Sequence, residues 1–185
     1  ILAGDALFLD PFGMIAASAL PDAVKVSLIL ELSDASGSRG MVAGQVLDME
    51  GEHKQLTLAE LQTIHANKTG RLLAYPFIAA GLILELQADI AQLLKKIGKK
   101  LGLAFQVRDD ILDLVADFEA LGKTPQKDLV AEKSTYPALL GLEESKALLT
   151  SELDACEDLL DQITAACNFD PRAIKKLIEG LRIDG

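Results

Sequence analysis

The residues with the clearest capacity for chemistry are three aspartates in the run Asp109-Asp110-Ile111-Leu112-Asp113. The surrounding apolar spacing is that of a buried helix, on which Asp109 and Asp113 would lie one turn apart on the same face. Like charges at this spacing oppose helix formation by about 0.2–0.5 kcal/mol per pair. A divalent cation would offset this repulsion, and Mg²⁺ is often held by one or two carboxylates together with substrate phosphates. The run therefore favours a magnesium site, although an acidic, solvated helix face would give the same pattern.

The composition favours helices and limits the classes of partner. Half of the 185 residues are hydrophobic, only 4% are aromatic, and there is no tryptophan. This length fits one domain with a real core, and the mixture is more typical of helices than of a β-sandwich. The net charge of −10 argues against nucleic-acid binding, which needs a basic face. An anionic ligand would therefore need a local site, in which a metal ion supplies positive charge.

The cysteines and the apolar runs suggest a cytoplasmic protein without a membrane segment. Cys156 and Cys167 are eleven residues apart, which is neither a CxxC motif nor a dense disulfide framework. The longest apolar run covers only residues 72–84 and contains Pro76, so we expect no membrane span.

Helical periodicity extends through nearly the whole chain, and we expect an all-α fold. Residues 116–135 contain Gly122 and Pro125 and are predicted to form a loop. The expected helices cover residues 1–18 with a break or kink at Pro11, 22–36, 40–48, 57–68 from a Thr57–Glu60 capping box, a tract to 88 broken near Pro76, 89–115, a segment around 148–167, and a last helix capped by Asp170 with Pro171 in its first position.

Several sequence blocks together resemble the trans-type polyprenyl diphosphate synthases, and within them most closely the bacterial farnesyl diphosphate synthases (geranyltranstransferases). The resemblance covers the whole chain. It implies an all-α helical bundle of the isoprenoid synthase type, in which residues 1–185 form the C-terminal part of a single domain that is incomplete at its N-terminus. The blocks that carry it are Gly4-Asp5-Ala6-Leu7, residues 40–48 (GMVAGQVLD), 65–70 (HANKTG), 102–113 (GLAFQVRDDILD), 121–123 (LGK), Asp128 and 132–137 (EKSTYP).

The resemblance assigns roles to eight residues. The aspartates expected to hold Mg²⁺, bridged to the diphosphate of an allylic substrate, are Asp109, Asp110 and Asp113. The residues expected to bind substrate are Lys68, Thr69, Gln106, Lys123 and Lys133, and the first four of these are also expected to act in catalysis. Taken singly, an exposed lysine is usually a solvated surface charge, and only the surrounding motifs favour a binding role.

The implied reaction condenses isopentenyl diphosphate with an allylic diphosphate such as dimethylallyl or geranyl diphosphate. An allylic carbon–oxygen bond breaks, diphosphate leaves, and the double bond of isopentenyl diphosphate attacks the resulting cation. Departure of so charged a group needs cations directed at it, which magnesium and lysine supply. A long apolar slot between helices would hold the prenyl tail. The resemblance also implies a homodimer.

The chain departs from the family pattern in ways that matter for activity. The family carries another DDxxD motif followed by paired arginines, and an N-terminal Gly-Lys-Arg stretch, and none of these occurs in the 185 residues. We therefore expect this polypeptide alone to lack prenyltransferase activity. Alternatives are a non-catalytic subunit of a heteromeric synthase and a terpene cyclase. Arg108 stands where the family usually has a neutral residue, and it could pair with Asp109 or point away.

Three other polar residues have less definite roles. Gln45 and Asp48 share a helix face beside glycines that permit close helix approach, so a packing role or a contact with substrate is possible. His65 is expected to be a surface or packing residue rather than a metal ligand.

Overall fold

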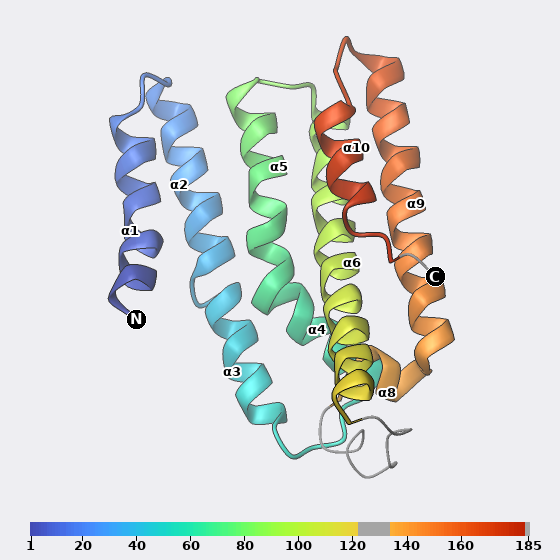
Figure 1. Ribbon diagram of the computed structural model, residues 1–185. Coiled ribbons are helices and arrows are strands. Elements are labelled where there is room, and N and C mark those ends of the chain that lie inside the picture. Colours follow the sequence, from blue (N-terminus) through green and yellow to red (C-terminus); the bar gives the residue numbers. More distant parts are fainter. Residues whose placement is uncertain (122–133, 184–185) are drawn as a thin grey trace.

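The computed structural model describes residues 1–121 and 134–183, and every regular element in this part is helical (Figure 1). This confirms the all-α prediction, and no helix in the described part is long and apolar enough to cross a membrane. The elements are α1 (Leu2–Ala17), α2 (Asp22–Ser36), α3 (Met41–Gly51), α4 (Leu58–His65), the π-helical turn η1 (Ala66–Gly70), α5 (Arg71–Ile83), α6 (Ala88–Leu121), α8 (Tyr136–Leu140), α9 (Leu142–Ala166) and α10 (Arg172–Glu179).

The long helix α6 lies between α5 and α9 and forms the centre of the bundle (Figure 1). Its buried positions recur every three or four residues, so one stripe of the helix faces the core. Burial of each large side chain in this stripe contributes about 1.5–3 kcal/mol. The stripe consists of Ile90, Leu94, Ile97, Leu101, Ala104, Val107 and Ile111, and its partners on α9 include Leu149, Leu153, Cys156, Leu160 and Ile163.

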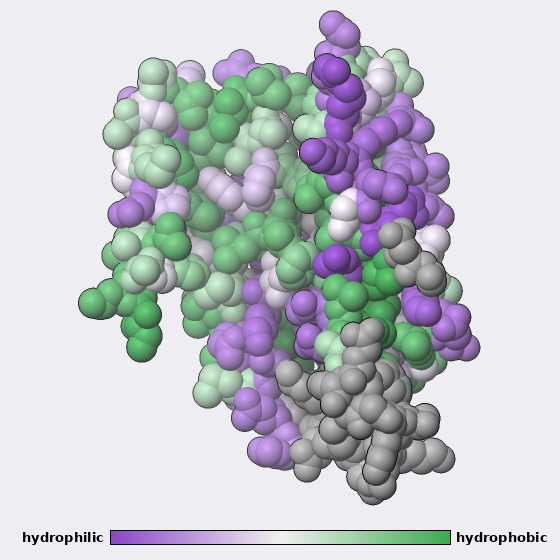
Figure 2. Space-filling model, in the orientation of Figure 1, coloured by the Kyte–Doolittle hydropathy of each residue, from purple (hydrophilic) through white to green (hydrophobic). Residues whose placement is uncertain are grey.

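Helix α1 lies at the edge of the bundle and contributes no buried residue (Figure 1). Its apolar side chains are largely exposed, and with those of α2 they form hydrophobic areas on the surface (Figure 2). We call this the α1–α2 surface, which consists of Leu2, Leu7, Leu9, Met14, Val26 and Leu30.

Most predicted helix positions are confirmed, but the break expected near Pro76 is wrong, and of the break or kink expected at Pro11 the break is wrong. Helix α1 continues through Pro11, and α5 runs without interruption through Pro76. A proline inside a helix removes one backbone hydrogen bond. In α5 this loss does not end the helix, because residues on both sides of Pro76 pack against α2 and α6.

The boundaries near the acidic run also differ from the expectation. Helix α6 continues to Leu121, so residues 116–121 are helical where a loop was predicted, and the rest of that predicted loop up to residue 133 lies outside the described residues. Residues 116–121 contain good helix formers, and Gly122 is the first helix breaker in the sequence. The short helix α8 was not predicted, although Thr135 caps it by accepting a hydrogen bond from the Ala138 N–H at 3.2 Å.

The predicted helix caps agree with the structure more closely than the predicted breaks and boundaries do. Thr57 and Glu60 form both reciprocal bonds of a capping box at the start of α4. At α10 the cap lies one residue later than expected, at Pro171, while the Asp170 carboxylate accepts a hydrogen bond from the Arg172 N–H at 3.1 Å. Ends of helices commonly differ by such a shift.

Two glycines let neighbouring helices approach the backbone of η1 very closely. A Cβ added to Gly44 of α3 would lie 2.1 Å from the Lys68 backbone nitrogen, and one added to Gly102 of α6 would lie 2.8 Å from the Gly70 Cα. These contacts are below any ordinary carbon contact distance, so neither position has room for a side chain. The turn is therefore held between α3 and α6 by backbone packing, as the glycine-rich pattern around residue 44 suggested.

We predict that Gly44→Ala destabilises the protein by about 2–3 kcal/mol, because the new methyl group must displace the backbone at Lys68. Gly13→Ala is the matched control, since an added Cβ there meets nothing within 4 Å on the exposed helix α1, and it should raise stability by about 0.5–1 kcal/mol. Urea unfolding of both variants measures the difference. Equal stability of the two variants would contradict the packing of η1 against α3.

Candidate diphosphate and metal site

The turn η1 directs two adjacent polar side chains toward different helices. Lys68 and Thr69 both lie in this five-residue π-helical turn, between the end of α4 and the start of α5. Such turns are frequently found at functional sites. The Lys68 side chain reaches α3 and that of Thr69 reaches α6. The turn therefore joins the two helices that carry the other polar residues of the site.

Lys68 forms an ion pair with Asp48 of α3. The Lys68 Nζ lies 2.5 Å from the Asp48 Oδ2, and both side chains are a little over one third exposed. This contact gives Asp48 a defined role that the sequence had left open, since the carboxylate holds the ammonium group beside η1. Gln45, which shares the helix with Asp48, is exposed and makes no hydrogen bond within the described part of the chain.

Thr69 is connected to the acidic run by a chain of hydrogen bonds, which we call the Thr69–Asp110 relay. The Thr69 hydroxyl donates to the Gln106 Oε1 at 3.0 Å, and the Gln106 Nε2 donates to the Asp110 Oδ1 at 3.5 Å. The other oxygen of Asp110 accepts from the Tyr136 backbone N–H at 3.0 Å. The relay therefore brings together three predicted site residues and adds Tyr136, which the sequence did not single out.

Asp110 differs from its two acidic neighbours in its surroundings. It is half-buried, whereas Asp109 and Asp113 are exposed. Burial raises the pKa of Asp110 to about 6, against the lowering effect of its hydrogen bonds with Tyr136 and Gln106, and the charges of Asp109 and Asp113 raise it further. The three aspartates of the motif therefore do not occupy equivalent positions.

The exposed pair of Asp109 and Asp113 suits a metal ion whose other ligands are waters or substrate phosphates. Neither Asp109 nor Asp113 makes a hydrogen bond or ion pair with another described residue. No three His, Cys, Asp or Glu side chains in the described part of the chain are grouped closely enough to hold a metal ion by themselves. Two free carboxylates fit Mg²⁺, which commonly keeps several waters and shares its coordination with substrate phosphates. Metal binding by these aspartates remains a prediction.

Beside the relay the ring of buried Tyr136 packs against that of half-buried His65. The rings of His65 and Tyr136 lie 5.5 Å apart between centroids and are tilted by 50°. Tyr136 is fully buried, and its hydroxyl and the His65 Nδ1 have no hydrogen-bond partner. A surface or packing role was expected for His65, and its ring contact agrees with packing, whereas Tyr136 was marked in the sequence only as part of the block 132–137.

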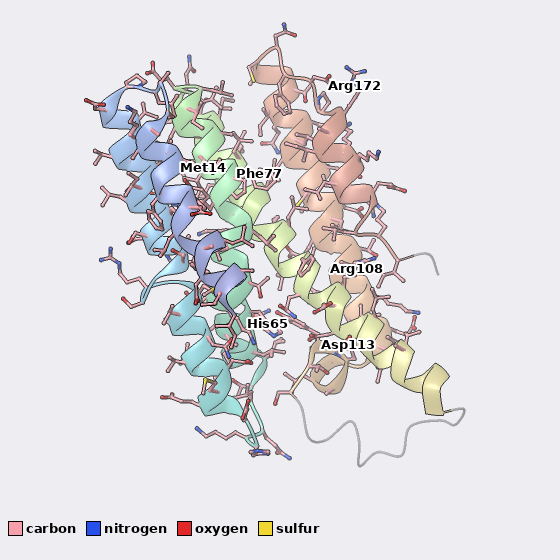
Figure 3. All side chains as sticks on the ribbon, turned by 60° about the vertical axis from the view of Figure 1, so that its left-hand side comes forward. Met14, His65, Phe77, Arg108, Asp113 and Arg172 are labelled. Carbon is pink, nitrogen blue, oxygen red and sulfur yellow. The ribbon has the colours of Figure 1, made fainter. Side chains whose placement is uncertain are left out.

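The remaining predicted residues are less well defined. The Nε of Arg108 is buried without a hydrogen-bond partner, and Arg108 forms no ion pair with Asp109. Figure 3 shows Arg108, Asp113 and His65 toward the same end of the bundle. Lys123 and Lys133, both predicted to bind diphosphate, lie outside the described residues.

Taken together, the described residues carry the kinds of group that a multiply charged phosphate ligand needs. Exposed carboxylates on α6 can hold a divalent cation, an ammonium group stands on η1, and Gln106 offers an amide between them. No arrangement of a nucleophilic side chain with a neighbouring base occurs among the described residues. The site is therefore suited to charge stabilisation rather than to covalent catalysis.

Comparison with known proteins agrees with the family resemblance drawn from the sequence motifs. Residues 1–168 match the Polyprenyl synthetase family. A farnesyl diphosphate synthase of Micrococcus luteus is 52% identical over 160 residues, which cover 86% of this chain and 55% of the relative. A putative farnesyl-diphosphate synthase from Marinomonas sp. MED121 superposes with a TM-score of 0.80 at 32% identity, covering 98% of this chain and 61% of the other.

A geranyltransferase from Helicobacter pylori, whose crystal structure holds magnesium and isoprenyl diphosphate, superposes with a TM-score of 0.76 at 31% identity. The match covers 97% of this chain and 58% of the other. This protein therefore belongs to the polyprenyl synthetase family, as its motifs indicated. The chain spans a little over half the length of these relatives.

We predict that His65 makes the protein less stable below neutral pH. Burial lowers the pKa of His65 to about 4, helped by the charge of Lys68 and opposed by that of Asp48. Between pH 6.5 and 4 the unfolded chain therefore binds a proton that the folded chain does not, so stability falls as the pH falls through this window. At this half-buried site we expect a loss of about 1–2 kcal/mol.

His65→Phe keeps a ring against Tyr136 but cannot titrate. Between pH 7 and pH 4 its free energy of unfolding should therefore fall less than that of the wild type, by about 1–2 kcal/mol. The control is His53→Asn, at an exposed position with a φ of 62° that asparagine tolerates. Urea unfolding at both pH values measures the change. A wild-type pH dependence that persists in His65→Phe would disprove this role.

Proposed function

We propose that this chain forms the diphosphate-releasing part of a prenyltransferase that joins isopentenyl diphosphate to an allylic diphosphate. The observation that carries the proposal is the Thr69–Asp110 relay, which connects the lysine-bearing turn η1 to the acidic run of α6. Membership of the polyprenyl synthetase family supports the same reaction. The farnesyl diphosphate synthase relatives suggest a product of similar length.

Each described residue has a physical task in this proposal. Asp109 and Asp113 would hold Mg²⁺, which supplies positive charge to the leaving diphosphate when it is bound. Lys68 would neutralise a further phosphate oxygen, while Asp48 fixes the position of its ammonium group. The side-chain amide of Gln106 would donate a hydrogen bond to the substrate. Positive groups fixed before the bond breaks stabilise the departing charge without reorganisation.

The other properties expected from the resemblance are also proposals. A homodimer would cover part of the exposed α1–α2 surface, because exposed apolar side chains are commonly buried at interfaces. Cytoplasmic location agrees with two cysteines that are not joined in a disulfide. The ion-paired Lys68 and the free Asp109 and Asp113 favour a catalytic protein over a non-catalytic subunit, since a subunit without chemistry needs neither feature.

We predict that the chain binds inorganic diphosphate only in the presence of Mg²⁺. Asp109→Ala, Asp113→Ala and Lys68→Gln should each weaken this binding about tenfold or more, because each removes a charge that faces the anion. Lys96→Gln is the control, since Lys96 is an exposed lysine on α6 outside the relay and the ion pair with Asp48. Isothermal titration calorimetry gives the affinities. Binding that ignores Mg²⁺ and the aspartate substitutions would disprove the assignment.

We also predict that purified residues 1–185 do not condense geranyl and isopentenyl diphosphates. The sequence contains one DDxxD motif and no paired arginines, so it supplies only part of the cationic groups that the resemblance implies for the reaction. A radiochemical assay for extraction of prenyl products into organic solvent measures turnover. Product formation by this polypeptide would show that its own residues suffice.

A further inference from the structure

Helix α6 carries a dense group of lysines that begins about two turns after its first residue. We call this group the lysine stripe, which consists of Lys95, Lys96, Lys99 and Lys100. Between Asp89 and Asp109 the helix contains no acidic residue. Lysines three or four positions apart on a helix repel one another and oppose its formation. A chain with a net charge of −10 therefore keeps a local positive surface at some cost to this helix.

Most of the positive charge of the stripe is not neutralised within the protein. Lys100 forms an ion pair with Glu152 of α9 at 2.9 Å. The other three, Lys95, Lys96 and Lys99, form no ion pair or side-chain hydrogen bond with another described residue. Elsewhere in the described part of the chain, no two lysines or arginines without an ion pair lie within four positions of each other. The stripe is therefore available to an anionic partner.

The stripe lies on a face of α6 that neither neighbouring helix covers. Gly98 packs on α5, where an added Cβ would lie 2.8 Å from the Ala74 Cα, and Ile97 is fully buried in the core. With about 3.6 residues per turn, Lys96 and Lys99 lie on a side of the helix away from both of these contacts. Both lysines are exposed. An extended charged surface can therefore approach the stripe directly.

The exposed face continues into a partly apolar groove beside α4 and η1. The groove has a volume of about 290 Å³ and is lined by Gln62, Ala66, Lys99 and Leu103. Lys99 therefore belongs to both the stripe and the groove, and none of the four lining residues is acidic. An ammonium group beside apolar side chains suits an amphiphile with an anionic head, because a purely ionic partner would gain nothing from Leu103 and Ala66.

We propose that the lysine stripe and the adjoining groove dock this protein on an anionic lipid surface. Lipid phosphates lie against Lys95, Lys96 and Lys99, and the apolar part of a lipid enters the groove at Leu103. Clustered lysines bind such membranes through the negative potential of the surface, without the fixed hydrogen bonds of an enclosed phosphate site. The protein lies on the membrane in this arrangement and does not cross it.

The docking surface is separate from the diphosphate site. Lys99 precedes Gln106 by seven residues, which corresponds to about 10 Å along the helix. The inference does not rest on the proposed function. If the chain also takes part in prenyl transfer, docking would release an amphiphilic product next to the lipid phase that dissolves it.

The first test measures co-sedimentation of the protein with vesicles made of equal parts of phosphatidylglycerol and phosphatidylcholine. Removal of the three unpaired charges should weaken binding about a hundredfold, since each lysine near such a surface contributes about fivefold. A matched control removes the same charge from α9 and α10 and should weaken binding less than about threefold. The stripe variant combines Lys95→Gln, Lys96→Gln and Lys99→Gln, and the control combines Lys146→Gln, Lys175→Gln and Lys176→Gln.

Binding of the wild type should also weaken with added salt and disappear on vesicles of phosphatidylcholine alone. Glutamine is a good helix former, and urea unfolding verifies that both triple variants remain folded. Equal losses in the two variants would overturn the inference, because net charge rather than the stripe would then control binding. It would also be overturned by a wild type that ignores anionic vesicles, or that binds phosphatidylcholine or soluble polyphosphate just as tightly.

The second test locates the membrane contact with a fluorescent reporter. The chain contains no tryptophan, so Leu103→Trp places a single reporter at the groove. Anionic lipids brominated along their acyl chains should quench its fluorescence strongly. Leu177→Trp is the control, since Leu177 is 50% exposed on α10, which packs on α9. Equal quenching of both reporters, or none at Leu103→Trp, would contradict docking through the groove.

The proposed function and the docking surface can fail independently. The stripe variant should bind diphosphate with Mg²⁺ as tightly as the wild type, because its lysines lie outside the diphosphate site. If the wild type failed to bind diphosphate with Mg²⁺, the proposed function would fall and the vesicle measurements would still decide the docking surface. If diphosphate bound normally but anionic vesicles did not, the function would stand and the docking surface would fall.

Discussion

The close backbone packing of η1 between two helices is the constraint on which the site depends. Gly44 and Gly102 leave no room for a side chain where α3 and α6 meet the turn, so the backbone around Lys68 and Gly70 has one position. A π-helical turn is intrinsically less favourable than a continued α-helix, and tertiary contacts of this kind can stabilise it. With the turn fixed, Lys68 reaches Asp48 on one side and Thr69 reaches Gln106 on the other.

The same helix that forms the core also carries the site, which explains how polar side chains are held in place. Val107 and Ile111 of α6 are fully buried against the rest of the bundle, while Gln106 and Asp110 on the adjoining face form the relay. Interiors are packed too densely for one helical residue to rotate without its neighbours. Hydrophobic burial therefore determines the direction of the polar groups, although it takes no part in their chemistry.

The sequence predicted what depends on local periodicity and missed what depends on contacts between helices. The spacing of apolar residues located α2 and the body of α6, and the Thr57–Glu60 pair located the start of α4. The break expected at Pro76 was wrong, because packing on both sides of α5 outweighs one lost hydrogen bond. The π-helical form of η1 had no local signal, since it is stabilised by glycines from two other helices.

The acidic motif illustrates the same limit at the level of single residues. Spacing alone treated Asp109, Asp110 and Asp113 as equivalent ligands, because a sequence pattern does not show which side of a helix meets another segment. The Tyr136 backbone N–H comes from a residue 26 positions later and gives Asp110 a partner that its neighbours lack. Two adjacent carboxylates thus acquire different environments, and burial raises the pKa of Asp110 to about 6. The fold thus half-buries one of two neighbouring acids and leaves the other exposed, because the backbone at the start of α8 lies against Asp110 and not against Asp109.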